Sequence, residues 1–119
     1  MEQPNSNPGQ LVHVQLLTAT DEKSRKITLS KTPQVEVMQL IVPAGRDVPT
    51  HEAQGDLVVH CLEGRVSLFA RGSHYDLAKG HLLHLLLNEP FSIRGIDDAS
   101  VLVTLIAAKT GGSVELIGD

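Results

Sequence analysis

The stretch that decides the fold runs from residue 45 to residue 64 and reads GRDVPTHEAQGDLVVHCLEG. Glycine stands at both ends of it, at Gly45 and Gly64. Residues 46–55 are polar and contain Pro49 and Gly55, which is typical of a loop. Residues 57–62 form a short apolar run that ends at a glycine turn, a pattern that favours a β-strand.

Short apolar runs separated by turn signals continue on both sides of this stretch. No stretch of ten or more residues combines a helical period with helix caps. Many short strands at even spacing predict an all-β sandwich or barrel. We expect a flexible tail over residues 1–10, a single domain over residues 11–119 and a turn at residues 88–90. The other expected strands cover residues 11–16, 27–29, 35–42, 65–70, 73–77, 82–87, 91–94, 100–107 and 113–117.

Composition excludes several classes of function. The 119 residues are 41% hydrophobic, 3% aromatic and without tryptophan, so the core must be aliphatic and base-stacking platforms are not expected. The net charge of −4 without a basic run speaks against nucleic-acid binding. Cys61 stands alone, which excludes an internal disulfide. The polar start and the short leucine run 82–87 predict a soluble, cytoplasmic protein without membrane contact.

The spacing of this stretch resembles the first motif of the cupins, small barrels of the double-sheet jelly-roll type. That motif places glycine, histidine, histidine, glutamate and glycine at the intervals that here hold Gly45, His51, Ala53, Leu57 and Gly64. In the second motif only the first position, Gly80, keeps its residue type, and Phe91 stands at the position of its histidine. The resemblance covers residues 35–107 and implies a single-domain cupin-type jelly-roll β-barrel, paired as a homodimer.

In metal-binding cupins the two histidines and the glutamate of the first motif and the histidine of the second hold one divalent metal. The resemblance carries over only His51, because Ala53, Leu57 and Phe91 cannot coordinate a metal. We therefore expect no cofactor and a metal-independent protein. The alternative is an atypical divalent-metal site drawn from His51, Asp56, His60 and His84.

Alternation along residues 57–62 assigns the remaining candidates to faces of a strand. If Leu57 points inward, then Val59 and Cys61 do too, and Cys61 is a buried hydrophobe rather than a nucleophile. Asp56 would turn inward only through a bulge. His60 would point outward, either as a surface imidazole or at a subunit contact. His84, within a run of leucines, is expected to be a core histidine with a hydrogen-bond partner, the alternative being a residue that reaches the cavity.

Three functions remain open from the sequence. The first is small-molecule binding or sensing in the barrel, with His51 as polar anchor and Ala53, Leu57, Val59, Phe91 and His84 as walls. The second is an enzyme acting on a sugar-like or keto substrate, either metal-free through His51 or with the atypical metal site. The third is a scaffold that binds another protein.

Overall fold

The computed structural model describes residues 9–15, 23–52, 55–86 and 90–107, with the backbone alone over residues 49–52. Within these ranges the chain forms nine strands and no helix, and hence no helix that could cross a membrane. The strands are β1 (Arg25–Lys31), β2 (Val35–Val42), β3 (Asp47–Glu52), β4 (Gly55–Glu63), β5 (Arg65–Ala70), β6 (Ser73–Ala78), β7 (Leu82–Leu85), β8 (Pro90–Gly95) and β9 (Ala99–Ala107).

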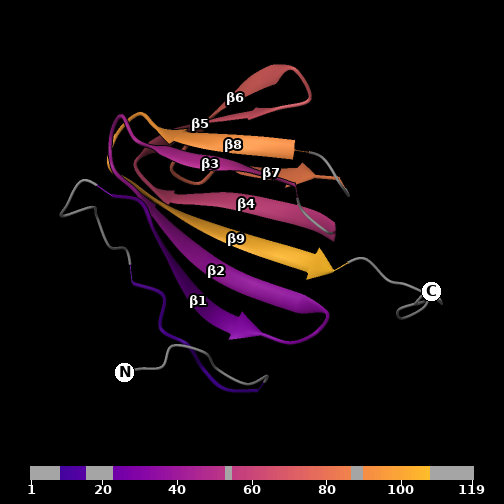
Figure 1. Ribbon diagram of the computed structural model, residues 1–119. Coiled ribbons are helices and arrows are strands. Elements are labelled where there is room, and N and C mark those ends of the chain that lie inside the picture. Colours follow the sequence, from indigo (N-terminus) through magenta and orange to yellow (C-terminus); the bar gives the residue numbers. More distant parts are fainter. Residues whose placement is uncertain (1–8, 16–22, 53–54, 87–89, 108–119) are drawn as a thin grey trace.

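The strands form two antiparallel sheets that face each other (Figure 1). The five-stranded sheet has the order β1-β2-β9-β4-β7, and the four-stranded sheet has the order β3-β8-β5-β6. From β2 onward the chain passes repeatedly from one sheet to the other, and only the β5–β6 hairpin stays within one. This is the double-sheet jelly roll, so the predicted all-β fold is confirmed.

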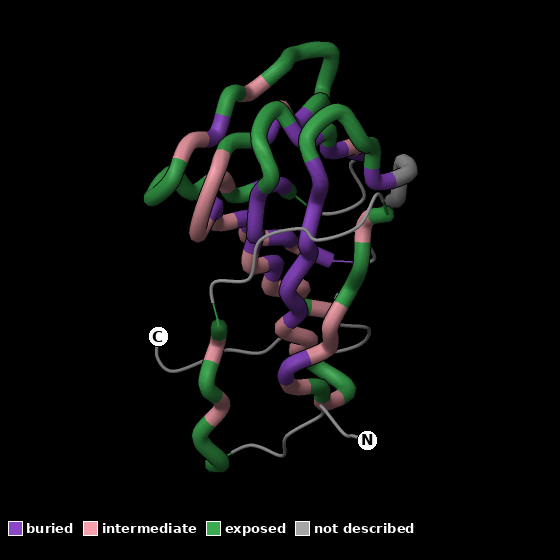
Figure 2. Tube along the Cα trace, turned by 90° about the vertical axis from the view of Figure 1, so that its left-hand side faces the viewer, coloured by how far each residue is buried: buried purple, intermediate pink, exposed green. Residues whose placement is uncertain are grey.

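One continuous apolar cluster fills the space between the sheets, because alternate residues of each strand point inward. The five-stranded sheet contributes Met38, Leu40, Val42, Leu57, Val59, Cys61, Leu85, Ala99, Val101 and Val103. The four-stranded sheet contributes Val48, Val66, Leu68, Ala70, Leu77, Phe91 and Ile93. Figure 2 shows this buried layer as purple segments in the middle of the molecule.

The glycines of the two motifs lie in turns that require their backbone conformation. Gly45, Gly64 and Gly80 have φ angles of 79°, 78° and 90°, a region that L-residues with side chains rarely adopt. At Gly64 a Cβ atom would also overlap the backbone carbonyl oxygen of Asp98. These turns therefore position the strands that carry the motif residues.

Two strand predictions were wrong. Residues 46–55 were expected to be a loop, but β3 lies within them and pairs with β8, with an irregular register between Val48 and His51. Pro49 is tolerated there because β3 is an edge strand of its sheet. The strand expected at residues 11–16 does not form over its described part, residues 11–15. The strand expected at 113–117 and most of the turn at 88–90 lie outside the described residues.

Candidate functional site

The positions that correspond to the cupin ligands come from both sheets. The backbone of His51 on β3 pairs with that of Phe91 on β8, and Leu57 lies on β4 in the five-stranded sheet. Ala53 and the side chain of His51 lie outside the described residues. The described motif positions therefore lie on three strands, β3, β4 and β8.

The two described side chains at these positions do not fit a metal. Leu57 and Phe91 are buried in the apolar cluster and offer no nitrogen or oxygen donor. A protein site for a transition metal needs at least three such ligands. Within the described part of the chain, no three His, Cys, Asp or Glu side chains come together in a group that could hold a metal ion.

Three residues of the atypical metal set, Asp56, His60 and His84, point away from the barrel interior. Asp56 and His60 alternate with the inward-pointing Leu57 and Val59, so they lie on the outer face of the five-stranded sheet. His84 pairs with Val58 on the same outer face. Of the set, Asp56 and His84 come within bonding distance, with 3.2 Å between Asp56 Oδ2 and His84 Nε2.

The prediction for His84 was therefore wrong. It is neither a core histidine nor a wall of a cavity, since its side chain is 52% exposed and points away from the barrel. Its neighbour Leu85 takes the inward position instead. The bulge that would have turned Asp56 inward does not occur either, because the irregular register of β4 lies further along, between Cys61 and Glu63.

Cys61 is a buried side chain of the interior. Burial raises the pKa of its thiol, and the nearby carboxylate of Glu63 acts in the same direction, against a smaller lowering by a hydrogen bond with the Glu63 backbone. Its Sγ lies 3.5 Å from the carbonyl oxygens of both Glu63 and Gly64. A buried thiol that resists ionisation is a poor nucleophile, so Cys61 has a structural role.

The interior is not equally closed on all sides. Four members of the apolar cluster, Met38, Leu40, Val48 and Phe91, are 7–9% exposed, whereas the others are exposed by 3% or less. Met38 and Leu40 lie on β2, and Val48 and Phe91 lie on β3 and β8 of the opposite sheet. We call these four residues the apolar corner. All four are still buried, and the partly buried Tyr75, Leu83 and Leu105 pack against the cluster elsewhere.

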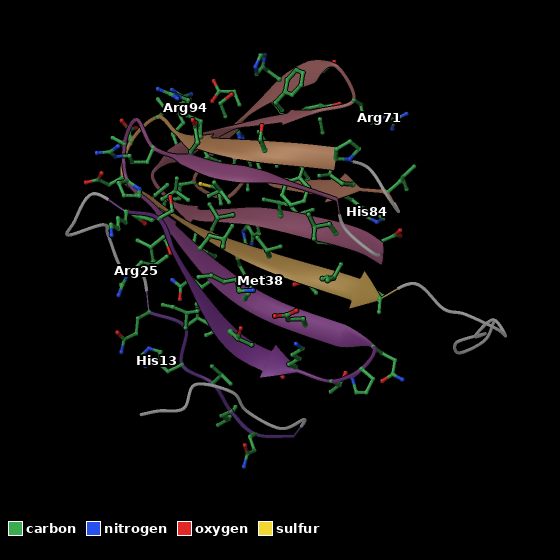
Figure 3. All side chains as sticks on the ribbon, in the orientation of Figure 1. His13, Arg25, Met38, Arg71, His84 and Arg94 are labelled. Carbon is green, nitrogen blue, oxygen red and sulfur yellow. The ribbon has the colours of Figure 1, made fainter. Side chains whose placement is uncertain are left out.

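The apolar corner lies on the side of the barrel where β1 and β3 form the edges of their sheets. Ser24, next to the start of β1, donates a hydrogen bond to the carbonyl oxygen of Asp47 at the start of β3, over 3.4 Å. Lys26 and Thr28 of β1 pair directly with Leu40 and Met38. Residues paired in this way share a face of the sheet, so β1 adds polar groups beside the apolar corner. Figure 3 labels Met38 near the centre of the molecule, over the five-stranded sheet.

Sequence reasoning found Phe91 but missed the rest of this corner. The alternation of residues 35–42 could have placed Met38 and Leu40 on one face, as it did for Leu57 and Val59. Val48 carried no usable signal, because its segment was interpreted as a loop.

Comparisons with known proteins agree with the fold. No family model matches the sequence, and no curated protein matches it either. Among solved structures, a cupin superfamily protein from Desulfitobacterium hafniense superposes with a TM-score of 0.73 at 17% identity, covering 77% of this chain and 84% of that one. An RmlC-like cupin protein from Desulfovibrio desulfuricans gives a TM-score of 0.70 at 21% identity, covering 82% and 97%.

A third similar structure is a conserved protein of unknown function from Streptococcus pyogenes. It gives a TM-score of 0.71 at 13% identity and covers 87% of this chain and 99% of that one. At such identities the likeness concerns the fold alone. The chain therefore has the cupin fold, as the spacing of its glycines predicted.

Proposed function

We propose that this chain is a metal-independent binding module that takes a small molecule at the apolar corner. The observation that supports the proposal is that Met38, Leu40, Val48 and Phe91 have the largest exposed fractions within the buried cluster. Pockets for small molecules are mostly apolar, with a few polar groups that fix the ligand's orientation. The apolar corner offers such a surface beside the starts of β1 and β3, which Ser24 and Asp47 join by a hydrogen bond.

The chemistry of the corner favours a ligand with an apolar body and an anionic end. Met38 and Phe91 would contact the body, while Lys26 and Thr28 on β1 would meet the charged end. His51, whose backbone lies opposite Phe91, is the further polar anchor in this proposal. Leu57 and Val59 would then support the corner from within the barrel rather than touch the ligand, since both are more deeply buried.

The test uses anilinonaphthalene sulfonate, a probe with an apolar body and one anionic group. We expect saturable binding in a fluorescence titration, with the amide resonances of Met38, Val48 and Phe91 shifting in a two-dimensional NMR spectrum. A well-dispersed spectrum would exclude binding to a loosened core. Absence of saturable binding would contradict the proposal for this class of ligand.

Variants separate the corner from other surfaces. Phe91→Ala and Lys26→Gln should each weaken binding of the probe at least about fivefold. Leu77→Ala, a core change on β6 away from the corner, and Lys79→Gln, a charge change outside it, are the matched controls and should leave binding within about twofold. If Phe91→Ala and Leu77→Ala weakened binding of the probe equally, the apolar corner would not be its binding site.

A further inference from the structure

The two ends of the barrel interior differ in how they are closed. At the end where β2 finishes and β9 begins, Val42 and Ala99 are fully buried. Backbone hydrogen bonds close this end, since Gly45 N donates to the Gly95 carbonyl oxygen over 2.7 Å and Gly95 N donates to the Arg46 carbonyl oxygen over 2.8 Å. We call it the closed end. The opposite end, where β2 begins and β9 finishes, lies on the right in Figure 1, at the arrowhead of β9.

The inward side chains become more exposed towards the opposite end along three strands. On β2 the exposed fraction rises from 0% at Val42 to 9% at Met38, and on β8 it rises from 1% at Ile93 to 7% at Phe91. On β9 the inward-pointing Leu105 is only half-buried, although it packs against the apolar cluster. Both sheets therefore become more accessible to solvent towards the same end of the barrel.

Glu36 lies on the inner face at this opposite end. It precedes Met38 by two residues on β2, so both side chains lie on the same face of the strand, and Glu36 is half-buried. Its backbone pairs with that of Leu105, which in turn pairs with Leu57. Directly paired residues share a face of the sheet. A carboxylate thus stands in the same inner row as Leu57 and beside the apolar corner.

Lys31 is the charged residue that β1 places opposite Glu36. The two residues pair directly across β1 and β2, and Lys31 is exposed. The ion pairs of the described residues do not include one between these two side chains. A cation from a ligand can therefore reach the Glu36 carboxylate, with Lys31 as a competing charge.

We propose that Glu36 binds a cationic group of the ligand that is taken at the apolar corner. This inference rests on the proposed function and narrows its ligand to a zwitterion, with an ammonium at Glu36, an apolar body at Met38 and a carboxylate at Lys26. A carboxylate that accepts from an ammonium makes one of the stronger hydrogen bonds of proteins.

The register of β1 and β2 sets the length of such a ligand. Lys26 pairs with Leu40, and Leu40 lies four residues beyond Glu36 on β2. The two charged positions are therefore about 13 Å apart along the strand direction. The lysine and glutamate side chains cover part of this distance, so a linear amino acid such as 8-aminooctanoate fits the remainder.

The experiment compares 8-aminooctanoate with octanoate in calorimetric titrations of the full chain. Octanoate has the apolar body and the anionic end alone. An added ammonium weakens binding to an apolar surface unless it finds a partner, because it loses its hydration. We expect 8-aminooctanoate to bind at least about fivefold more tightly than octanoate.

Three variants locate the ammonium. Glu36→Gln should abolish the preference for 8-aminooctanoate and leave octanoate binding within about twofold. Lys31→Gln should keep or increase the preference, since it removes the competing cation. Asp97→Asn is the matched control, because it removes the same charge from an exposed residue near the closed end and should leave the preference unchanged.

The two ligands distinguish a failure of this inference from a failure of the proposed function. If octanoate binds at the apolar corner and 8-aminooctanoate binds no more tightly, the role of Glu36 is overturned and the proposed function stands. A preference that Glu36→Gln leaves intact also overturns it. If neither ligand binds, both proposals fail. The comparison on the wild type needs no variant, so it decides the matter even if Glu36→Gln does not fold.

Discussion

The outer faces of the two sheets differ although their inner faces are alike. The outer face of the four-stranded sheet carries two ion pairs, Arg65–Asp76 at 3.1 Å and Arg94–Asp47 at 3.0 Å. The outer face of the five-stranded sheet carries the Asp56–His84 pair, the exposed Leu82, Leu86 and Ile106, and a covered half where Gln39, Ile41 and Ser100 are buried. Figure 3 shows Arg94 on the upper sheet and His84 at the border of the lower one.

The two outer faces meet the same requirement in different ways. Successive side chains of a strand point to opposite faces of its sheet, so each sheet has an outer face that must be either hydrated or covered. The four-stranded sheet is polar outside and can remain in water. The outer face of the five-stranded sheet mixes exposed leucines and an isoleucine with Asp56, His60 and His84. Residues 9–15 reach this face at Gln15, which accepts a hydrogen bond from Gln39.

The largest effects should come from the inner faces, where the two sheets are expected to behave alike. Leu57→Ala in the five-stranded sheet and Leu68→Ala in the four-stranded sheet should each lower the free energy of unfolding by about 3 kcal/mol, because both remove a buried side chain. Urea denaturation measures this loss. Ile96→Ala, at an exposed isoleucine beyond β8, is the control and should cost less than about 1 kcal/mol. A loss for Leu57→Ala as small as that of the control would show that the barrel interior is loosely packed near the motif.

A smaller loss is expected from the covered half of the outer face. Gln39→Ala removes the donor to Gln15 and Ser100 and should destabilise the fold by about 1–3 kcal/mol. Gln34→Ala, an exposed change just before β2, is the control for denaturation. If Gln39→Ala has the stability of the wild type, then the hydrogen bond from Gln39 to Gln15 does not hold residues 9–15 to this face.

How much of the fold could be predicted from the sequence differs from strand to strand. The strands 35–42 and 65–70 were predicted with their observed limits, because turn residues bound apolar runs on both sides. The strand β3 was missed because a charged edge strand with Pro49 has the composition of a loop. Residues 11–15 alternate as a strand would, but in the structure they form no strand and contact the sheet through the hydrogen bond from Gln39 to Gln15.

At the candidate site, too, the sequence predicts the orientation of some side chains and not of others. The motif spacing predicted that Leu57 and Phe91 would point into the barrel, and both do. The orientation of His84 could not be predicted, because leucines occupy both faces of residues 82–87 and one residue of register decides between inside and outside. The apolar corner depends on which edges of the two sheets lie close together. No local sequence pattern predicts that arrangement.

A rise in pH should act on the inner face through Cys61. The pKa of the buried Cys61 thiol is raised from its ordinary value of 9.0, so the folded state keeps the neutral form. This contribution to stability is present below that value and is lost as the pH rises above it, since the unfolded chain then ionises first. Wild type should therefore lose more stability than Cys61→Ala between neutral and strongly alkaline pH. Parallel losses in the two proteins would contradict the burial of this thiol.

The smallest effect should come from the outer face of the four-stranded sheet. Arg65→Gln removes a half-exposed ion pair with Asp76 and should cost at most about 0.5–1 kcal/mol, less at high salt. Thermal unfolding at low and high ionic strength measures it. A salt-independent loss above about 2 kcal/mol would mean that this face is held together by its ion pairs rather than hydrated.

The central claim is that the cupin frame of this chain serves a metal-independent function. The most direct test is elemental analysis of untagged protein purified without chelators, repeated after incubation with excess iron, manganese, nickel, copper or zinc and removal of unbound metal. The account predicts far less than one ion per chain in both samples, because Leu57 and Phe91 occupy ligand positions with hydrocarbon. A near-stoichiometric metal that His51→Ala removes would contradict it and would place a metal centre at the barrel motif.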